Sequence, residues 1–361
     1  MKICHLTSLH NRYDTRVFVK QCCSLVQAGH DVHLIVADGK QSEVKNGVNI
    51  HDMGLRGGLK NRLLKTNKKI LEKAVSLNGD YYFFHDPELC IQALKLSKHG
   101  KKVIYDAHED SPRQFFTNAQ GSKLKAKLIA NFLERLEHKT ARKIYGMLTA
   151  TEGIQDRYKS YNSNIEVVKN YPKVEELIND IKWGSRADQA CYVGGLRNTR
   201  GISEIVKACS NSNLKLKLAG PWQPLSYQKE LEKSETYKVV DYLGFLNRNA
   251  IKSLLSNSKV GMLTLYKTEN HLHSLPVKLY EYMIAGIPVI ASDIPLWKEI
   301  IEENHCGICI DPHNVDAIEN AIKYILENPA EAEKMGENGK NAVIQKFSWN
   351  NEFIKILKMI N

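Results

Sequence analysis

SLPVKLYEYMIAGIPVIASDIPLWKEII (residues 274–301) combines a loop, a helix and a buried strand in one short run. The helix is expected to begin after Pro276 and to end at Gly286, and PVIAS then forms the strand. Free N–H groups and a partial positive charge make the first turn of such a helix a natural seat for a diphosphate. Lys278 adds a full charge in that turn. Glu281 follows one turn later, where a carboxylate can accept hydrogen bonds from the two ribose hydroxyls, although an isolated Glu there is more often an ordinary exposed helical residue.

Short apolar runs alternate with helical segments along the whole chain, which favours parallel sheets. The pattern breaks near residues 164–188 and then resumes. We therefore predict an α/β protein of two Rossmann-like, doubly wound domains facing a central cleft, since ligands of such sheets bind at the carboxyl ends of the strands. The first domain is expected to span 1–170 and the second 171–345, and the helix at about 345–361 is a candidate to pack back on the first.

The bulk composition is that of a globular protein, and 361 residues suffice for two cores. No apolar run is long enough to span a membrane, and the first residues do not resemble a signal peptide, so we expect a cytoplasmic protein. The eight cysteines are scattered, which in a reducing compartment indicates buried free thiols. Cys306 and Cys309 form a CxxC pair, but no second ligand pair for zinc is apparent, and packing is the favoured interpretation.

The excess positive charge lies entirely in the first half. Through Tyr171 there are 28 Lys and Arg against 17 Asp and Glu, whereas the remainder has 23 of each. Such asymmetry indicates that the first half meets a polyanion: nucleic acid, an anionic membrane or a pyrophosphate-bearing substrate.

The quoted run resembles the donor-binding motif of retaining glycosyltransferases of family 4, which have the GT-B fold. Further segments are similar to that family. They are YVGGLRNTRGISEIVKA (192–208), LAGPW (218–222), VDYLGFLNRNAIKSLLSNSKVGMLTL (240–265), DPHNVDAIENAIKYIL (311–326) and KFSWNNEFIKIL (346–357), with DAHED (106–110) and LTATEGIQD (148–156) in the first half. The resemblance covers nearly the whole chain, and the segment around Glu281 is its most specific part.

By that resemblance, Glu281 would bind the donor ribose, Arg200 would take the place of a Lys on the diphosphate, and His108 would touch the donor sugar. A surface cation at Arg200 and a strand-end histidine at His108 are the alternatives. Lys278, with the backbone amides at Ser274 and Leu275, would stabilise the charge that develops on the leaving β-phosphate. Gly244 is assigned to the donor site with them, and no metal or other cofactor is expected.

Two departures from the family pattern bear on the donor site. Gly195 stands where relatives have an Arg, and Arg197 is a candidate substitute; alternatively, Gly195 only forms a turn. The first Glu of the family's Glu-x7-Glu pair is replaced by His273, with His271 and Glu269 as further candidates for its role. The resemblance therefore does not fix which residue aligns the donor sugar.

The loop TSLHNRYDTRVF near the N-terminus contains Arg12, Asp14 and Arg16. We assign it to the acceptor side, where the arginines could grip a phosphate. The alternative is a solvated helix start that Asp14 and Arg16 cap.

Basic and apolar residues are combined in GLRGGLKNRLLKTNKKILEK (54–73) and KLKAKLIANFLERL (123–136). Such helices suit an anionic bilayer surface, unless their apolar stripes face the domain's own core.

The sequence thus predicts a peripheral membrane glycosyltransferase on the inner face of the cell membrane. It would transfer a sugar, with UDP as the expected nucleotide, to a lipid-pyrophosphate-linked or oligosaccharide acceptor in O-antigen, capsule or other surface polysaccharide synthesis. An epimerase-like enzyme of the same fold and a nucleic-acid-binding protein are the alternatives, and the scarcity of aromatic residues among the basic ones disfavours the second.

Overall fold

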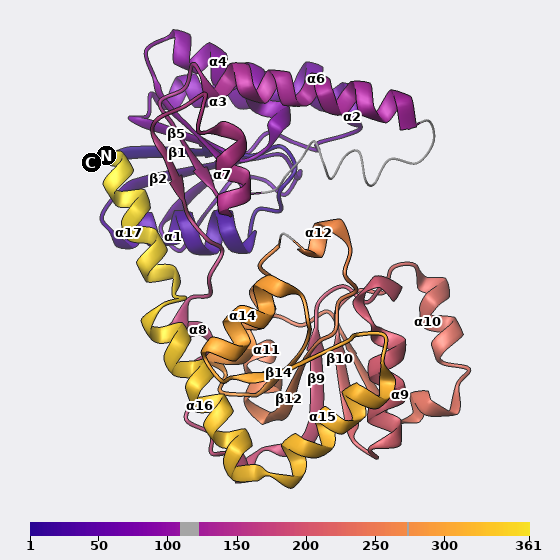
Figure 1. The fold of residues 1–361 in the computed structure, drawn as a ribbon. Helices are drawn as coiled ribbons and strands as arrows, with labels where there is room; N and C mark the ends of the chain where they lie inside the picture. The colour runs from indigo at the N-terminus through magenta and orange to yellow at the C-terminus, as the bar shows by residue number, and fades with distance from the viewer. Residues whose placement is uncertain (109–122, 273) are drawn as a thin grey trace. The chain divides into compact units, whose positions relative to one another are not determined.

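The chain folds into two compact α/β units in a computed structural model that describes residues 1–108, 123–272 and 274–361 (Figure 1). Unit 1 comprises Met1–Asn170 and Asn350–Asn361, and unit 2 comprises Tyr171–Trp349. Each unit has its own hydrophobic core around its own sheet.

Unit 1 is built on an eight-stranded sheet with the order β3-β4-β2-β1-β5-β6-β7-β8. All neighbouring strands are parallel except the β3–β4 pair. The chain moves outward from β1 in one direction and then returns to β5 on the other side, so the switch point of the sheet lies between β1 and β5. The strands are β1 (Lys2–Leu6), β2 (Asp31–Val36), β3 (Glu43–Lys45), β4 (Val48–Asp52), β5 (Tyr81–Phe84), β6 (Lys102–Ala107), β7 (Gly146–Thr149) and β8 (Ile165–Val167).

The helices of unit 1 connect successive strands. Asp14 caps the first of them, because its side chain accepts hydrogen bonds from two backbone N–H groups of the first turn. The described helical segments are η1 (Thr15–Cys22, π-helical), α1 (Cys23–Gln27), α2 (Leu59–Asn61), η2 (Arg62–Thr66), α3 (Asn67–Leu77), η3 (Pro87–Leu89), α4 (Cys90–Lys98), α6 (Lys123–Ala141), α7 (Glu152–Tyr158) and α17 (Trp349–Ile360).

Helix α17 joins unit 1 although unit 2 precedes it in the chain. Its Glu352 accepts a hydrogen bond from the backbone N–H of Lys169 at 2.8 Å, and its Lys355 donates to the carbonyl of Val167 at 2.9 Å. These contacts fasten the last helix to the end of the first unit's sheet.

Unit 2 contains a six-stranded, all-parallel sheet with the order β11-β10-β9-β12-β13-β14. Its switch point lies between β9 and β12, because the chain first moves outward to β11 and then returns. The strands are β9 (Ala187–Val193), β10 (Lys215–Ala219), β11 (Val240–Gly244), β12 (Ser258–Leu263), β13 (Val289–Ser292) and β14 (Gly307–Ile310).

Helices again separate the strands of unit 2, and the predicted doubly wound, Rossmann-like architecture is confirmed for both units. The helical segments are α8 (Val174–Leu177), η4 (Trp183–Ser185), η5 (Asn198–Arg200), α9 (Ile202–Asn211), α10 (Leu225–Leu231), η6 (Glu235–Val239), α11 (Arg248–Asn257), α12 (Glu269–Leu272), α13 (Val277–Ile284), α14 (Pro295–Glu303), α15 (Val315–Glu327) and α16 (Pro329–Gln345).

The cysteines are all free thiols, and all but Cys309 are buried. Burial raises the pKa of Cys306 and of Cys309 to about 12. Neither is therefore the reactive thiolate that a redox CxxC motif needs.

Candidate functional site

In unit 2, the first turn of α13 meets the loop that follows β9. A side chain at Gly194 would place its β-carbon 2.7 Å from the Nζ of Lys278, and Gly194 has a φ of +136°, which favours glycine. The same Nζ lies 3.8 Å from the centre of the Tyr192 ring. The switch point of the sheet therefore presents a lysine amine at a helix N-terminus, a combination that attracts anions.

Arg200 contributes a second cation to this place. Burial lowers the pKa of Lys278 well below its usual range, and the nearby charge of Arg200 lowers it further. Within the described ranges, neither side chain forms an ion pair. Two neighbouring cations that lack a carboxylate partner can receive a bound anion such as a diphosphate.

The backbone around these cations is tightly packed. A β-carbon at Gly201, which directly follows Arg200, would lie 2.3 Å from the carbonyl oxygen of Thr264. This close approach holds the β9 loop against the end of β12. Gly244 accepts a hydrogen bond from the N–H of Gly220 at 2.7 Å, and Gly195 accepts one from the Tyr192 hydroxyl at 3.2 Å. Both glycines thus lie at the carboxyl edge of the sheet, where their carbonyl groups hold neighbouring loops.

Glu281 is buried, with 8% of its surface exposed, and its Oε1 accepts a hydrogen bond from Arg248 at 2.7 Å. Arg248 also donates to Glu176 at 2.9 and 3.1 Å. The alternative that Glu281 is an ordinary exposed helical residue is therefore excluded. Sequence reasoning missed Arg248 and Glu176. Arg248 lies within the quoted segment 240–265, but nothing in the sequence alone links it to a carboxylate 33 residues away.

The remaining residues assigned to the donor site have mixed surroundings. Arg197 is exposed and hydrogen-bonds to Gln223. The N–H of Ser274 donates to the carbonyl of His271 at 3.3 Å, so this amide is already engaged within its own loop, whereas Leu275 is half-buried against the core. The Nδ1 of His271 contacts the carbonyl of Tyr266 at 2.7 Å, and Glu269 is exposed. His273 lies outside the described residues.

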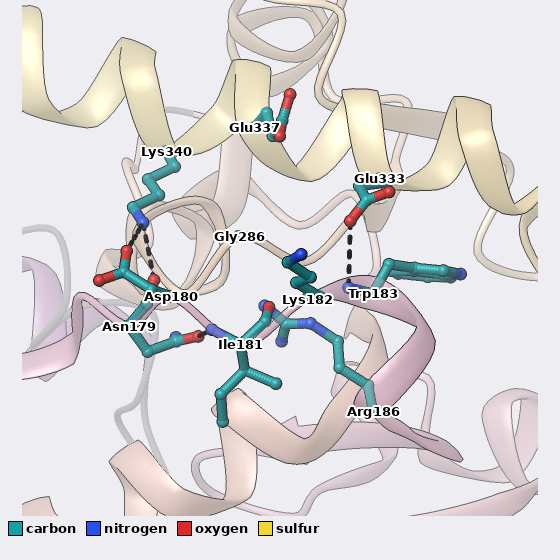
Figure 2. A pocket seen from close by; sticks show the side chains of 10 residues that line it. All are labelled: Asn179, Asp180, Ile181, Lys182, Trp183, Arg186, Gly286, Glu333, Glu337 and Lys340. Atoms are coloured by element: carbon teal, nitrogen blue, oxygen red, sulfur yellow. Dashed lines mark hydrogen bonds and ion pairs between the residues drawn. The ribbon is translucent and has the colours of Figure 1, made fainter.

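A separate cavity of about 190 Å³ lies in unit 2 beside α16 (Figure 2). Lys340 pairs with Asp180 at 2.8 Å across it, and the carboxylate of Glu333 accepts a hydrogen bond from the N–H of Trp183 at 3.2 Å. Its lining includes none of the predicted donor-site residues, so it is not the diphosphate site.

In unit 1, a buried carboxylate organises the region around His108. Asp106 is fully buried and accepts from the Arg16 guanidinium at 2.7–3.2 Å, from Gln21 at 2.7 Å and from His85 at 3.1 Å. Half-buried His108 has its Nδ1 3.6 Å from the same carboxylate. Burial alone would raise the pKa of Asp106, but Arg16, His108 and His85 outweigh it and hold the pKa well below its usual range.

These contacts correct the role assigned to the two arginines of the N-terminal loop. Arg16 is 3% exposed and is held by Asp106, and Arg12 is also 3% exposed and bonds Asp38 at 2.6 and 2.8 Å and Glu43 at 2.5 Å. Asp14 caps a helix. Because both guanidinium groups are buried against internal carboxylates, neither is available to grip an acceptor phosphate.

His85, Asp106 and His108 bring potential metal-ligand atoms within 4.8 Å of one another, the one such group among the described residues. The carboxylate already binds the Arg16 guanidinium, and the Nε2 of His85 lies 3.0 Å from the Nδ1 of His5. These lone pairs and protons are engaged in hydrogen bonds, so the cluster is a hydrogen-bonded network and we assign no metal to it.

Residues 173–342 match the model of a family described as glycosyl transferases group 1. This segment of unit 2 is therefore similar to group 1 glycosyl transferases. The matched segment includes Arg200, Lys278 and Glu281, so the loop after β9 and helix α13 both lie within it. The positions 109 and 110 of the DAHED motif precede this segment and lie outside the described residues.

Known proteins are similar to the chain over different lengths. An uncharacterized glycosyltransferase of Methanocaldococcus jannaschii is 29% identical over 44% of this chain and 41% of its own length. The poly(ribitol-phosphate) alpha-N-acetylglucosaminyltransferase of Staphylococcus aureus is 22% identical over 83% of this chain and 64% of its own. The chain thus spans less than two thirds of the length of both relatives.

The Anabaena protein HepE, solved in complex with UDP, superimposes with a TM-score of 0.75 at 14% identity and covers 100% of this chain and 99% of its own. At that identity the likeness shows the fold. The chain has two Rossmann-like domains that match GT-B structures, as predicted from the sequence.

Proposed function

We propose that this chain is a glycosyltransferase that moves a sugar from a nucleoside-diphosphate sugar to a glycan acceptor. The observation that carries the proposal is the pair of cations, Lys278 and Arg200, at the first turn of α13 within the segment that matches group 1 glycosyl transferases. Glu281 lies one helical turn further along α13 and is the proposed ligand of the donor ribose. UDP is the nucleotide we propose, supported by the UDP complex of the similar HepE structure.

The chemistry that this arrangement supports is stabilisation of the leaving group. When the bond from the sugar to the β-phosphate breaks, negative charge grows on the phosphate oxygens. Preorganised cations and helix N–H groups stabilise that charge, usually the largest single contribution to catalysis. This role needs neither a metal nor a covalent intermediate, in keeping with a family 4 enzyme that retains the anomeric configuration. His108, oriented by Asp106, is the proposed contact of unit 1 with the donor sugar.

UDP should stabilise the protein against heat, and UMP should do so much less, because only the diphosphate engages both cations. A ligand at 100 times its dissociation constant stabilises by about 2.7 kcal/mol, or about 5–10 °C in a unit of this size. Since a bound diphosphate favours the charged form of Lys278, whose pKa is lowered, affinity for UDP should fall as the pH rises, beginning below the range of an ordinary lysine.

A thermal-shift titration with UDP, UDP-glucose and UDP-N-acetylglucosamine, with and without EDTA, measures this. An equal response to UMP and UDP, or none to either, would reject the diphosphate site. Consumption of a nucleotide sugar with neither transfer nor release of UDP would instead favour the epimerase-like alternative.

The acceptor is proposed to be a lipid-linked glycan of surface polysaccharide synthesis, held at the inner membrane face. Unit 1 exposes apolar side chains beside its basic ones. Leu128, Ile129 and Phe132 of α6 are 62%, 46% and 64% exposed and share one face of the helix. These three side chains therefore do not face the core of unit 1. The side chains of Lys123, Leu124 and Lys125 are not described. Similar exposure occurs at Leu55, Leu59, Leu63 and Leu64 beside Arg56, Lys60 and Lys65.

The exposed stripe is proposed to dock on the membrane surface. No helix in the described ranges is both long enough and apolar enough to cross a bilayer. An exposed helix with apolar and basic residues can instead lie on an anionic bilayer, where each nearby cation adds about 1 kcal/mol.

Replacing Leu128 and Phe132 by Ser together should lower binding to phosphatidylglycerol vesicles at least about tenfold, since each buried side chain contributes about 1.5 kcal/mol or more. Co-sedimentation with the vesicles at low and high salt measures this binding. Leu225→Ser in unit 2, where Leu225 is 66% exposed, is the matched control. Equal binding of both variants, or stronger binding to an oligonucleotide than to vesicles, would contradict membrane docking.

A further inference from the structure

The cavity beside α16 is formed entirely by residues of unit 2 (Figure 2). Residues 179–186 line one side, α16 lines the other, and Gly286 closes the space between them at the turn that ends α13. A β-carbon at Gly336 of α16 would lie 2.3 Å from the carbonyl oxygen of Gly286. A glycine at this position therefore lets the helix pass close to the turn and bring its polar side chains to the cavity.

Arg186 lies across the cavity from α16 and has a donor group that the protein leaves unused (Figure 2). The residue is 7% exposed. Its two terminal nitrogens donate to backbone carbonyls at 2.9–3.3 Å, those of Ile181, Leu255, Ser256, Ser258 and Ala285. Its Nε has no hydrogen-bond partner among the described residues. Because a buried N–H without an acceptor is unfavourable, a ligand that supplies an acceptor oxygen here gains a hydrogen bond.

The other unused groups of the lining are one ammonium and two carboxylates. In the part of the chain that the structure describes, the side chains of Lys182 and Glu337 have no hydrogen bond or ion pair. Glu333 uses only its Oε1, which accepts from the N–H of Trp183 at 3.2 Å. Lys340 and Asp180 already pair with each other at 2.8 Å. The cavity thus offers unused donors and unused acceptors together.

This combination favours a neutral ligand that has several hydroxyl groups. The lining contains three basic and three acidic side chains, so its formal charge is zero. An anion would be repelled by Glu333 and Glu337, and a cation would be repelled by Lys182 and Arg186. A hydroxyl both donates and accepts, so neighbouring hydroxyls can serve the Arg186 Nε–H and a carboxylate at the same time. The volume of about 190 Å³ is below the about 300–1,000 Å³ of pockets for drug-sized ligands, which limits the ligand to one sugar residue.

We propose that this cavity is a binding site for a single neutral sugar residue, separate from the donor site. Its lining includes none of Arg200, Lys278 and Glu281, so a sugar bound here leaves the proposed diphosphate and ribose ligands free. The inference goes beyond the proposed function, because binding in this cavity requires no nucleotide.

Saturation-transfer NMR with methyl glucoside and with methyl N-acetylglucosaminide tests the inference, with excess UDP present to occupy the donor site. At least one glycoside should bind with a millimolar Kd, as expected for so small a ligand. Glu337→Ala should weaken this binding at least about tenfold, because it removes a charged hydrogen-bond acceptor, and should leave the affinity for UDP unchanged. Since Glu337 is exposed and unpaired among the described residues, the fold should tolerate the change.

Glu331→Ala is the matched control, because Glu331 is an exposed glutamate of the same helix outside the cavity lining. It should bind the glycoside as the wild type does. The inference is overturned if neither glycoside binds, if Glu337→Ala binds as well as Glu331→Ala, or if only citrate or spermidine binds. Displacement of the glycoside by UDP would also overturn it, since the sugar would then occupy the donor site. A wild type that binds a glycoside in this way but does not bind UDP would support the inference while rejecting the proposed donor site.

Discussion

Glu281→Gln should weaken the affinity for a UDP-sugar about 10- to 100-fold and leave the melting temperature within a few degrees of the wild type. The loss corresponds to a hydrogen bond with a charged partner, about 1.5–3 kcal/mol. Isothermal titration with UDP-glucose and with UDP would measure it, and both ligands should be affected alike because both contain the ribose.

The fold should tolerate this change because of the partners around Glu281. Gln has nearly the same shape and can still accept the hydrogen bond that Arg248 donates at 2.7 Å. Arg248 also keeps its second carboxylate, Glu176, at 2.9 Å. The variant therefore removes the charge proposed to bind the donor without leaving the Arg248 guanidinium unpaired.

Glu176→Gln provides the control, since it disturbs Arg248 to a similar degree without altering Glu281. It should retain most of the affinity for the nucleotide. If both variants lose affinity equally, Glu281 acts by holding Arg248 and not by contacting the ribose. If neither loses affinity, the assignment of α13 to the donor is rejected.

Asp106→Asn should destabilise unit 1 by about 3–5 kcal/mol, the usual cost of leaving one partner of a buried ion pair alone. Arg16 is 3% exposed and makes its ion pair with Asp106 at 2.7 Å. An asparagine would leave its guanidinium charge buried without compensation. For a unit of this size the melting temperature should fall by about 10 °C, measurable by calorimetry.

The difference in stability between Asp106→Asn and the wild type should become smaller as the pH is lowered. The folded protein holds the pKa of Asp106 well below that of the unfolded chain. The stability that this carboxylate contributes is thus fully present above about pH 4, the unfolded pKa, and is lost as the pH falls through the folded pKa. Melting curves between pH 7 and about pH 3 would follow the loss.

Asp38→Asn tests whether removing any carboxylate that pairs with a buried arginine destabilises unit 1 equally. Arg12 would keep Glu43 at 2.5 Å and the carbonyl of Gln41 at 2.9 Å, so this change should cost much less. Equal destabilisation by the two variants would show that Asp106 has no special role in unit 1.

The alternation of elements predicted both sheets because apolar strands and amphipathic helices have different periods. It missed the hairpin of β3 and β4, which are short and partly exposed. Asn46 and Gly47 form its turn with φ values of 49° and 78°, and an Asn-Gly pair between strand-like residues is a hairpin signal that could have revealed it.

The sequence predicted helix α13 and the positions of Lys278 and Glu281 on it, because a helix and its first turn are local features. It did not predict partners that come from distant parts of the chain. Arg16 looked like a free cation because Asp106 is 90 residues away in sequence, and only the parallel pairing of the sheet brings the two together. The pairing of Arg248 with Glu281 was hidden for the same reason.

Helix α17 sets the order in which the protein can mature on the ribosome. Domains usually fold as they emerge, the N-terminal one first. Here unit 1 lacks some of its contacts until α17, which follows all of unit 2, has been translated. These are the contacts that α17 makes with Tyr145, Val167 and Lys169. Unit 2 can therefore finish folding before unit 1, although it is translated later. A nascent chain stalled before residue 350 should leave the edge of unit 1 that α17 covers exposed to proteases and chaperones.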